Sequence, residues 1–270
     1  MDPKRLNWIA KLWAGVGVLV TAVVIVVFQP WTTTLGPSSS PQRVAAQAAI
    51  AVTLYVPVSL YCMTKFAQRD HWYTFIGTYI PDSERKMLGP RTLTSIAVLA
   101  AAFAAFGLFS VAGLDLAAMV AAFAAVTFGP VITGLSVLVG SFLRFALGGM
   151  GFMVPIRVPV FAVQDATNWV VVSTVFWTVI RSDRITDRSR EWGAFVGVLV
   201  VFLLVHAGTQ HWDQFLVNPW DAYLGWVFGI FPTFWPSAAI SMVAGAVGGY
   251  VLWNQYATDA RKEQVGIKPT

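Results

Sequence analysis

Long apolar runs without a charged residue recur along the chain, and they constrain its fold more than any other feature. Residues 13–28 read WAGVGVLVTAVVIVVF, and residues 44–63, 92–110 and 237–256 are similarly apolar. Runs of about 20 apolar residues are long enough to cross a bilayer as helices. Charged residues make up only 11% of the 270, less than half of the about 25% usual in a soluble domain. The sequence therefore predicts an all-α, polytopic transmembrane helix bundle.

The distribution of Lys and Arg predicts how many times the chain crosses the membrane. Residues 116–147 form either one long helix, which gives seven spans, or a hairpin that turns at Gly129-Pro130, which gives eight. With eight spans and a cytoplasmic N-terminus, 15 cations lie inside and 3 outside or in the membrane; seven spans change this split to 10 and 8. Because cytoplasmic loops carry an excess of Lys and Arg, we expect eight spans with both termini inside.

Four regions are expected in a multi-pass protein of the cytoplasmic membrane. They are an N-terminal transmembrane hairpin (1–70), a cytoplasmic loop (71–91), a six-helix core (92–256) and a cytoplasmic tail (257–270). The first apolar run follows a basic start but precedes no small-residue cleavage site, so we interpret it as a retained anchor rather than a signal peptide.

Small residues recur every fourth position on three helices. The stripes are Ala97, Ala101 and Ala105; Ala117, Ala121 and Ala125; and Gly245 with Gly249. In lipid, such stripes let two helices approach closely and gain dispersion energy. Internal packing explains any one of them, but the 97–105 stripe is the best candidate for docking another membrane subunit.

Polar groups inside apolar helices suggest a binding site. Arg144 either snorkels to the headgroups or faces inward to pair with Asp165 or an anionic ligand group. Asp165 and Asn168 share one helical face, and Trp169 is adjacent.

The outer segment 210–236 is rich in tryptophan and carries two acids without Lys or Arg. It is either an interfacial aromatic belt or a lid over a ligand cavity. As a lid, it adds these substrate-binding candidates: Trp212, Asp213, Trp220 and Asp221.

Several functional classes lack the residues that they need. The single cysteine and three histidines without HxxH or HExxH spacing predict no metal site, and no cofactor is expected. No P-loop motif and no nucleophile–base pair is present, so the chain is not expected to be an enzyme or to hydrolyse ATP itself. The basic net charge of +5 is explained by topology and not by nucleic acid.

Residues 116–149 carry a Phe-Gly-Pro turn, a glycine-spaced helix and an arginine before Gly-Gly. This pattern resembles the second and third helices of the substrate-binding S components of energy-coupling factor (ECF) vitamin transporters. The alanine-rich helix 92–110 is similar to the first helix of that family, whose small-residue face docks on a coupling subunit. The resemblance covers 92–256, about three fifths of the chain; it departs at Ser141, where the family commonly has Asp, and in the extra N-terminal hairpin.

Two functions remain open. The resemblance implies a substrate-binding subunit for a vitamin or similar small molecule, energised by separate ATPase and coupling subunits. The alternative is a structural or accessory subunit of a larger membrane complex, in which the stripes are interfaces and no ligand binds.

Overall fold

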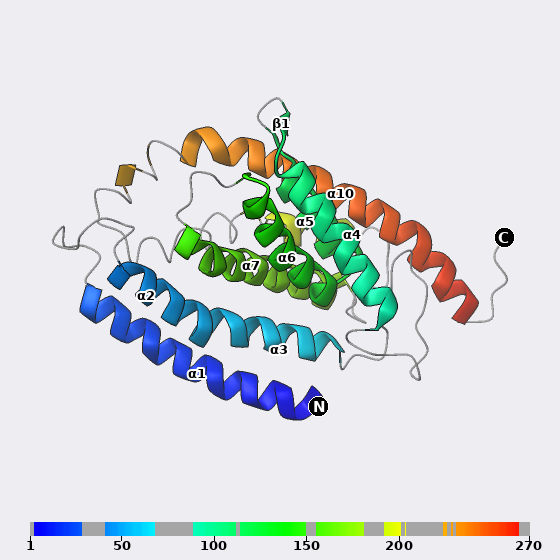
Figure 1. Cartoon of the computed structure of the whole chain (residues 1–270). Coiled ribbons are helices and arrows are strands. Elements are labelled where there is room, and N and C mark those ends of the chain that lie inside the picture. Colours follow the sequence, from blue (N-terminus) through cyan, green and yellow to red (C-terminus); the bar gives the residue numbers. More distant parts are fainter. Residues whose placement is uncertain are drawn as a thin grey trace.

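The computed structural model is helical apart from one two-residue β-hairpin (Figure 1). It describes residues 3–28, 41–67, 89–111, 114–149, 155–180, 192–200, 203, 224–225, 228 and 231–264. Within these residues, three helices are long and apolar enough to cross a membrane: Arg5–Val27, Pro41–Ala67 and Trp235–Leu252. The all-α class is confirmed, and the three long apolar helices indicate a membrane protein.

The N-terminal hairpin consists of two antiparallel rods. The first is α1 (Pro3–Phe28), and the second joins α2 (Pro41–Ile50), the π-helical turn η1 (Ala51–Tyr55) and α3 (Val56–Ala67). At one end Asn7 Nδ2 donates to the Tyr61 carbonyl at 3.4 Å and to Thr64 Oγ1 at 3.3 Å. At the other end Val24 packs with Ala46 and Ile50. Both rods are longer than the apolar runs at 13–28 and 44–63. Backbone hydrogen bonds determine where a helix ends, so it can continue past its hydrophobic segment.

The π-helical turn precedes a proline. Pro57 has no N–H to donate, and the extra residue in η1 is the kind of irregularity by which a helix accommodates a proline ring. Gly17 of α1 lies against this turn, where any side chain would collide with the backbone of Thr53 and Leu54. The glycine thus allows the two rods to touch.

The segment 116–147 is a hairpin and not one long helix. After α4 (Pro90–Phe106), β1 (Ser110–Val111) and β2 (Leu114–Asp115) come α5 (Leu116–Thr127) and α6 (Pro130–Ala146). Gly129 joins the last two with φ +83°, a conformation that favours glycine, and a Cβ there would lie 2.6 Å from the Phe66 ring. Pro130 then occupies the first turn of α6, where its missing N–H costs nothing.

The helix α5 is the centre of the bundle. Its alanines at 117, 121 and 125 are almost completely buried. Gly245 and Gly249 of α10 (Phe231–Gln264) lie against the backbone of Met119 and Phe123, so α10 packs closely on α5 inside the molecule.

Helix α7 (Val158–Ile180) follows the 3₁₀ turn η4 (Pro155–Arg157) and packs along α5. Near the C-terminal end of α5, the Ala125 carbonyl accepts hydrogen bonds from Ser173 Oγ at 2.7 Å and from Trp177 Nε1 at 3.0 Å. Carbonyls at a helix end lack partners within the helix, and hydrocarbon supplies none. These side chains therefore allow α5 to end inside the bundle.

Contacts between helices fix their directions. Ser136 of α6 donates to the Ile96 carbonyl of α4, and the Arg144 side chain near the end of α6 reaches Gly107 just beyond α4, so α4 and α6 run parallel. The same reasoning makes α5 parallel to both α7 and α10.

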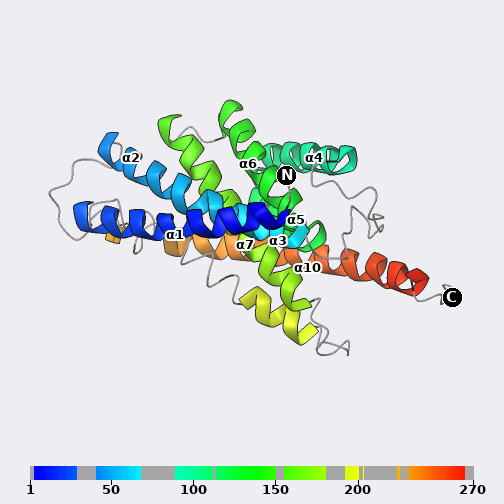
Figure 2. The ribbon, with the colours of Figure 1, turned by 90° about the horizontal axis from the view of Figure 1, so that it is seen from below.

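The N-terminal hairpin joins this arrangement through α7. Ser59 Oγ of α3 donates to Thr167 Oγ1 of α7 at 2.8 Å. Closer to the C-terminal ends of both helices, the rings of Phe66 and Trp177 are in contact, so α3 and α7 run parallel. Successive helices thus alternate in direction. Helices α1 and α10 lie on opposite sides of α7 (Figure 1), and seen from below α1 lies in front of α7 (Figure 2).

Candidate functional site

Three charged side chains lie near one another, without a direct ion pair, at the end of the bundle where α4 and α6 end and where α5 and α7 begin. Arg144 is in the last turn of α6, Asp115 is the N-cap of α5, and Asp165 is in the second turn of α7. The charges of Arg144 and Asp115 both act on the Asp165 carboxyl group. We call these three residues the charged cluster.

The Gly-Gly sequence after Arg144 ends α6 in a Schellman motif. Gly148 has φ +85°, and its N–H donates to the Phe145 carbonyl, while the Gly149 N–H donates to the Arg144 carbonyl, both at 2.9 Å. A glycine at this left-handed position satisfies helix-end carbonyls without Cβ strain. The motif fixes the backbone of Arg144 at the mouth of the cluster.

Two glycines make room for the Arg144 side chain. A Cβ on Gly107 would lie 2.7 Å from its Cδ and Nε, and a Cβ on Gly149 would lie 2.9 Å from its Cγ. The side chain therefore folds back over the C-terminal end of α4, where the helix dipole favours a cation. Its Nε is buried and donates no hydrogen bond within the described structure.

Asp165 has one hydrogen-bond partner from its own helix. Trp169 Nε1 donates to Asp165 Oδ1 at 3.1 Å, one turn further along α7. Asp115 is also engaged locally, because its Oδ1 accepts from the Ala118 N–H at 3.1 Å and caps α5. The cluster thus combines a guanidinium that has hydrogen-bonding capacity left with two partly engaged carboxyl groups.

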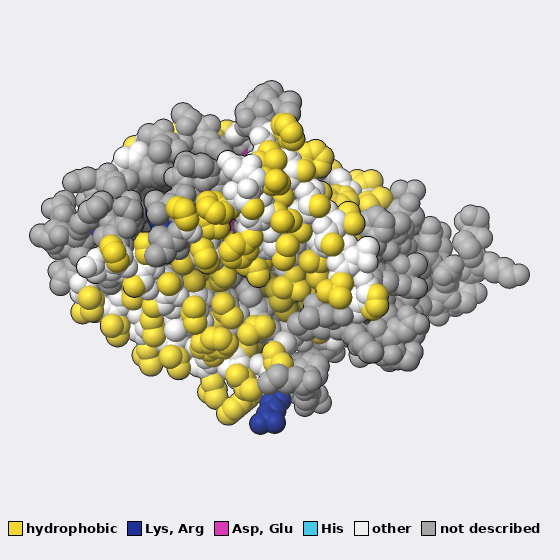
Figure 3. Space-filling model, viewed as in Figure 1, with side chains coloured by type: hydrophobic (Ala, Val, Ile, Leu, Met, Phe, Trp, Pro, Cys, Tyr) yellow, Lys and Arg dark blue, Asp and Glu magenta, His cyan; other side chains and the backbone are white. Residues whose placement is uncertain are grey.

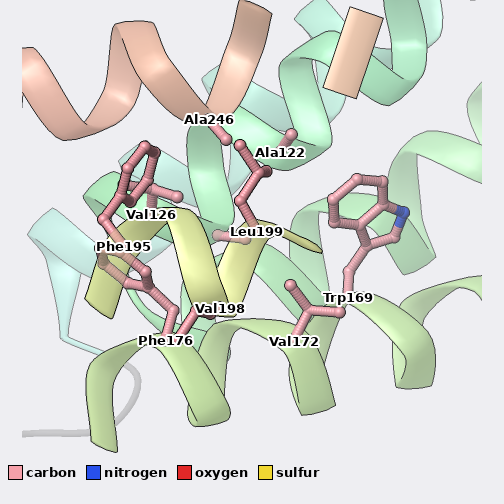
Figure 4. Close-up of a pocket in the computed structure, with 10 residues that line it drawn as sticks. Ala122, Val126, Trp169, Val172, Phe176, Phe195, Val198, Leu199 and Ala246 are labelled. Carbon is pink, nitrogen blue, oxygen red and sulfur yellow. The ribbon is translucent and has the colours of Figure 1, made fainter. Parts of the chain in front are cut away.

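The Trp169 ring faces the core rather than the outer end. It is 1% exposed and borders a small cavity between α5, α7, α10 and the helical segment 192–200 (Figure 4). The cavity is about 20 Å³ and entirely apolar in its lining, close to the size of one water molecule. It has no room for a vitamin, so within the described structure Trp169 orients Asp165 through its N–H.

Asn168 is half-buried on α7 beside these residues. The remaining candidates lie outside the described residues, and they are Trp212, Asp213, Trp220 and Asp221. The described part of the site therefore comes from α6, α7 and the start of α5.

The alanine stripe on α4 divides between two faces. Ala97, Ala101 and Ala105 are exposed, whereas Ala100 and Ala104 are 1% exposed and face the bundle. The exposed stripe is a flat, small-residue surface on the outside of the molecule.

Two features of the helix ends were missed by sequence reasoning. Asp115 belongs to the charged cluster, and an Asp immediately before an apolar helix was the available signal for its capping role. Arg43, counted among the cations outside or in the membrane, is 1% exposed on α2 and lies one turn before the buried Gln47. Burial of an arginine depends on neighbouring helices, and no local pattern shows it.

No family model, no curated protein and no solved structure matches this chain. The fold and the site define a helical membrane protein that carries a charged cluster at one end of its bundle.

Proposed function

We propose that the chain is the membrane-embedded substrate-binding subunit of an uptake system for a vitamin or similar small molecule, energised by separate ATPase and coupling subunits. The observation that carries this proposal is the meeting of Arg144 and Asp165 at one end of the bundle. They come from different helices and act on each other electrostatically without forming a direct ion pair. A ligand group placed between them would contact both.

The proposed ligand lies above the bundle and not inside it. The cavity that Trp169 borders in the described core holds only about 20 Å³. The outer segment 210–236 would cover the ligand, with its tryptophans stacking on a flat ring and its acids binding polar edges.

The exposed stripe Ala97–Ala101–Ala105 is the proposed docking surface for the coupling subunit. A second helix can approach such a surface closely, and its contacts replace contacts with lipid. The stripe is exposed because the internal contacts of α4 are made by another face of the helix, which includes Ala100, Ala104 and Phe103.

The proposed topology has eight spans in the cell membrane, with both termini in the cytoplasm. The alternation of helix directions and the 15-to-3 charge split support it. Cysteine labelling from outside the cell at positions 39 and 189, in a chain with Cys62 replaced, tests it. The expected result is labelling at 39 only, and external labelling at 189 but not at 39 contradicts the topology.

Native mass spectrometry of the gently purified protein tests the function. The expected spectrum contains a co-purified small molecule, and the Asp165→Asn and Arg144→Gln variants should each retain at least about tenfold less of it, because loss of a charged hydrogen bond costs about 1.5–3 kcal/mol. Arg144→Lys, which keeps the charge, should lose less. Partner subunits without any small molecule would favour the accessory-subunit alternative.

The docking surface has a matched pair of variants on neighbouring positions. Ala101→Leu adds volume on the exposed stripe, so it should weaken association with the partner subunit while the isolated chain stays folded. Ala100→Leu adds the same volume where α4 meets α6 and should instead destabilise the isolated chain. If Ala101→Leu leaves association unchanged, this face does not dock the partner.

A further inference from the structure

Two lysines at one end of the N-terminal hairpin share a single tyrosine ring. Lys11 Nζ of α1 lies 5.5 Å from the centroid of the Tyr61 ring, and Lys65 Nζ of α3 lies 5.6 Å from it. Lys65 Nζ also donates to Tyr61 Oη at 3.3 Å. Both lysines are exposed, and we call them the lysine pair.

The fold holds this pair together. The Asn7 hydrogen bonds to the Tyr61 carbonyl and to Thr64 lock α1 against α3 one turn away from Lys11. Cation–π contacts of about 0.5–1 kcal/mol each keep both ammonium groups near the ring. Within the described residues neither lysine pairs with a carboxylate, so two like charges are concentrated at one point and an anion there would be attracted by both.

An exposed apolar face begins directly at Lys11. Residues three or four apart along α1 share its side of the helix, and Gly15, Val18, Ala22 and Val26 are all exposed. From Lys11 to Val26 the helix rises about 22 Å, enough to span the about 15 Å depth of one leaflet of hydrocarbon. Gly15 has no neighbouring atom within 4 Å of a Cβ position, which leaves a shallow strip between larger side chains.

We propose that the lysine pair binds the phosphate of an anionic phospholipid whose acyl chain lies along the Lys11 face of α1. The charge complements a phosphodiester, and the adjoining apolar strip complements a hydrocarbon chain. Inorganic phosphate or an acidic peptide would use the lysines but would leave this strip without a partner. Figure 3 shows a small group of Lys or Arg atoms at the lower edge of the molecule, beside a surface that is largely hydrophobic.

A bound lipid of this kind bridges the two rods of the hairpin. It neutralises the repulsion between Lys11 and Lys65 and adds contacts along the outer face of α1. The site lies at the opposite end of α7 from Arg157 and the charged cluster, so it is independent of the proposed substrate site.

Lipid titration of the delipidated full chain, followed by native mass spectrometry, tests the proposal. Phosphatidylglycerol should bind at least about tenfold more tightly than phosphatidylcholine with the same acyl chains, because both lysines contribute to the preference. K11Q/K65Q should lose this preference, and K11R/K65R should keep it. Arg157→Gln removes a cation at the other end of the bundle and should also leave the preference unchanged.

A second probe separates a lipid from a free phosphate. Glycerophosphoglycerol, the deacylated form of phosphatidylglycerol, carries the same phosphodiester without acyl chains and should bind at least about a hundredfold more weakly than phosphatidylglycerol. Equal binding of the two would show a phosphate site and overturn the lipid proposal. A preference for phosphatidylglycerol that survives in K11Q/K65Q, with circular dichroism showing the native helix content, would overturn it as well. If the double variant unfolds, K11Q and K65Q singly should each reduce the preference, and an unchanged preference in both would count against the site.

Discussion

The hairpin α1–α3 and the hairpin α5–α6 each pair antiparallel helices but lie in different surroundings. The outer side of α1 is apolar and open, with Leu19 68% exposed and Val26 67% exposed. Six of the twelve residues of α5 are alanine, eight of the twelve are buried and none is exposed. One hairpin therefore has an open apolar face along its length, and the other contains a helix that is largely enclosed by protein.

This difference explains the lengths of the helices. α1 has 26 residues, about 39 Å of rise, whereas α5 has 12 residues, about 18 Å, which is shorter than the about 30 Å of a bilayer core. A helix that contacts lipid must bring its own backbone hydrogen bonds across the hydrocarbon. A helix enclosed by protein can end early, as α5 does, because Ser173 and Trp177 satisfy the Ala125 carbonyl.

The largest expected effect is at the α5–α10 contact. Gly245→Ala places a Cβ against the Met119 backbone, where neither helix can move aside, and should lower the free energy of unfolding by about 3 kcal/mol. Gly248→Ala on the same helix has nothing within 4 Å and is the matched control. Unfolding in mixed detergent and SDS micelles measures both, and equal stabilities would show that α5 is not tightly enclosed.

The next effect concerns the end of α5. Ser173→Ala combined with Trp177→Phe removes both donors to the Ala125 carbonyl and should cost about 1–3 kcal/mol, the penalty for a buried carbonyl without a partner. Thr174→Val alters a neighbouring side chain whose hydroxyl donates to the Val170 carbonyl and interacts with the Cys62 thiol, but it leaves no backbone carbonyl without a partner and should cost less. The same micelle assay compares them. A loss no larger than that of Thr174→Val would mean that the carbonyl finds another donor.

A smaller effect is expected where α1 meets α3. Gly17→Ala also meets backbone, that of Thr53, but α1 is an outer helix that can shift toward lipid, so the loss should be only about 1 kcal/mol. Gly15→Ala, with open space around it, serves as the control. A Gly17→Ala loss as large as that of Gly245→Ala would remove the distinction between the two hairpins.

The smallest effect is at the end of the outer hairpin. Asn7→Ala removes the hydrogen bonds to Tyr61 and Thr64 and should cost about 0.5–1 kcal/mol, since both are long and only partly buried. Hydrogen exchange should rise locally at the start of α1 and leave α5 unchanged. Faster exchange throughout α5 would show that the two hairpins unfold as one unit.

The sequence predicted which residues belong to the candidate site better than it predicted how these residues are arranged. Arg144 and Asp165 stand out because ionisable residues are rare in apolar helices. Their proximity depends on α6 and α7 packing side by side, and the inward turn of the Trp169 ring depends on small residues such as Ala122 across from it. The division of the α4 alanines into an exposed and a buried row likewise follows from where α6 lies.

The sequence by itself determined the helical membrane class and the turn at Gly129-Pro130, because hydrocarbon demands apolar runs and because a backbone with φ +83° favours glycine. Both features depend only on residues within one short segment of the chain. Tertiary structure decided which helix is enclosed, which cation is buried and which charges meet. Those outcomes depend on contacts between segments distant in the chain, and in lipid small differences in side-chain size set which helix faces approach.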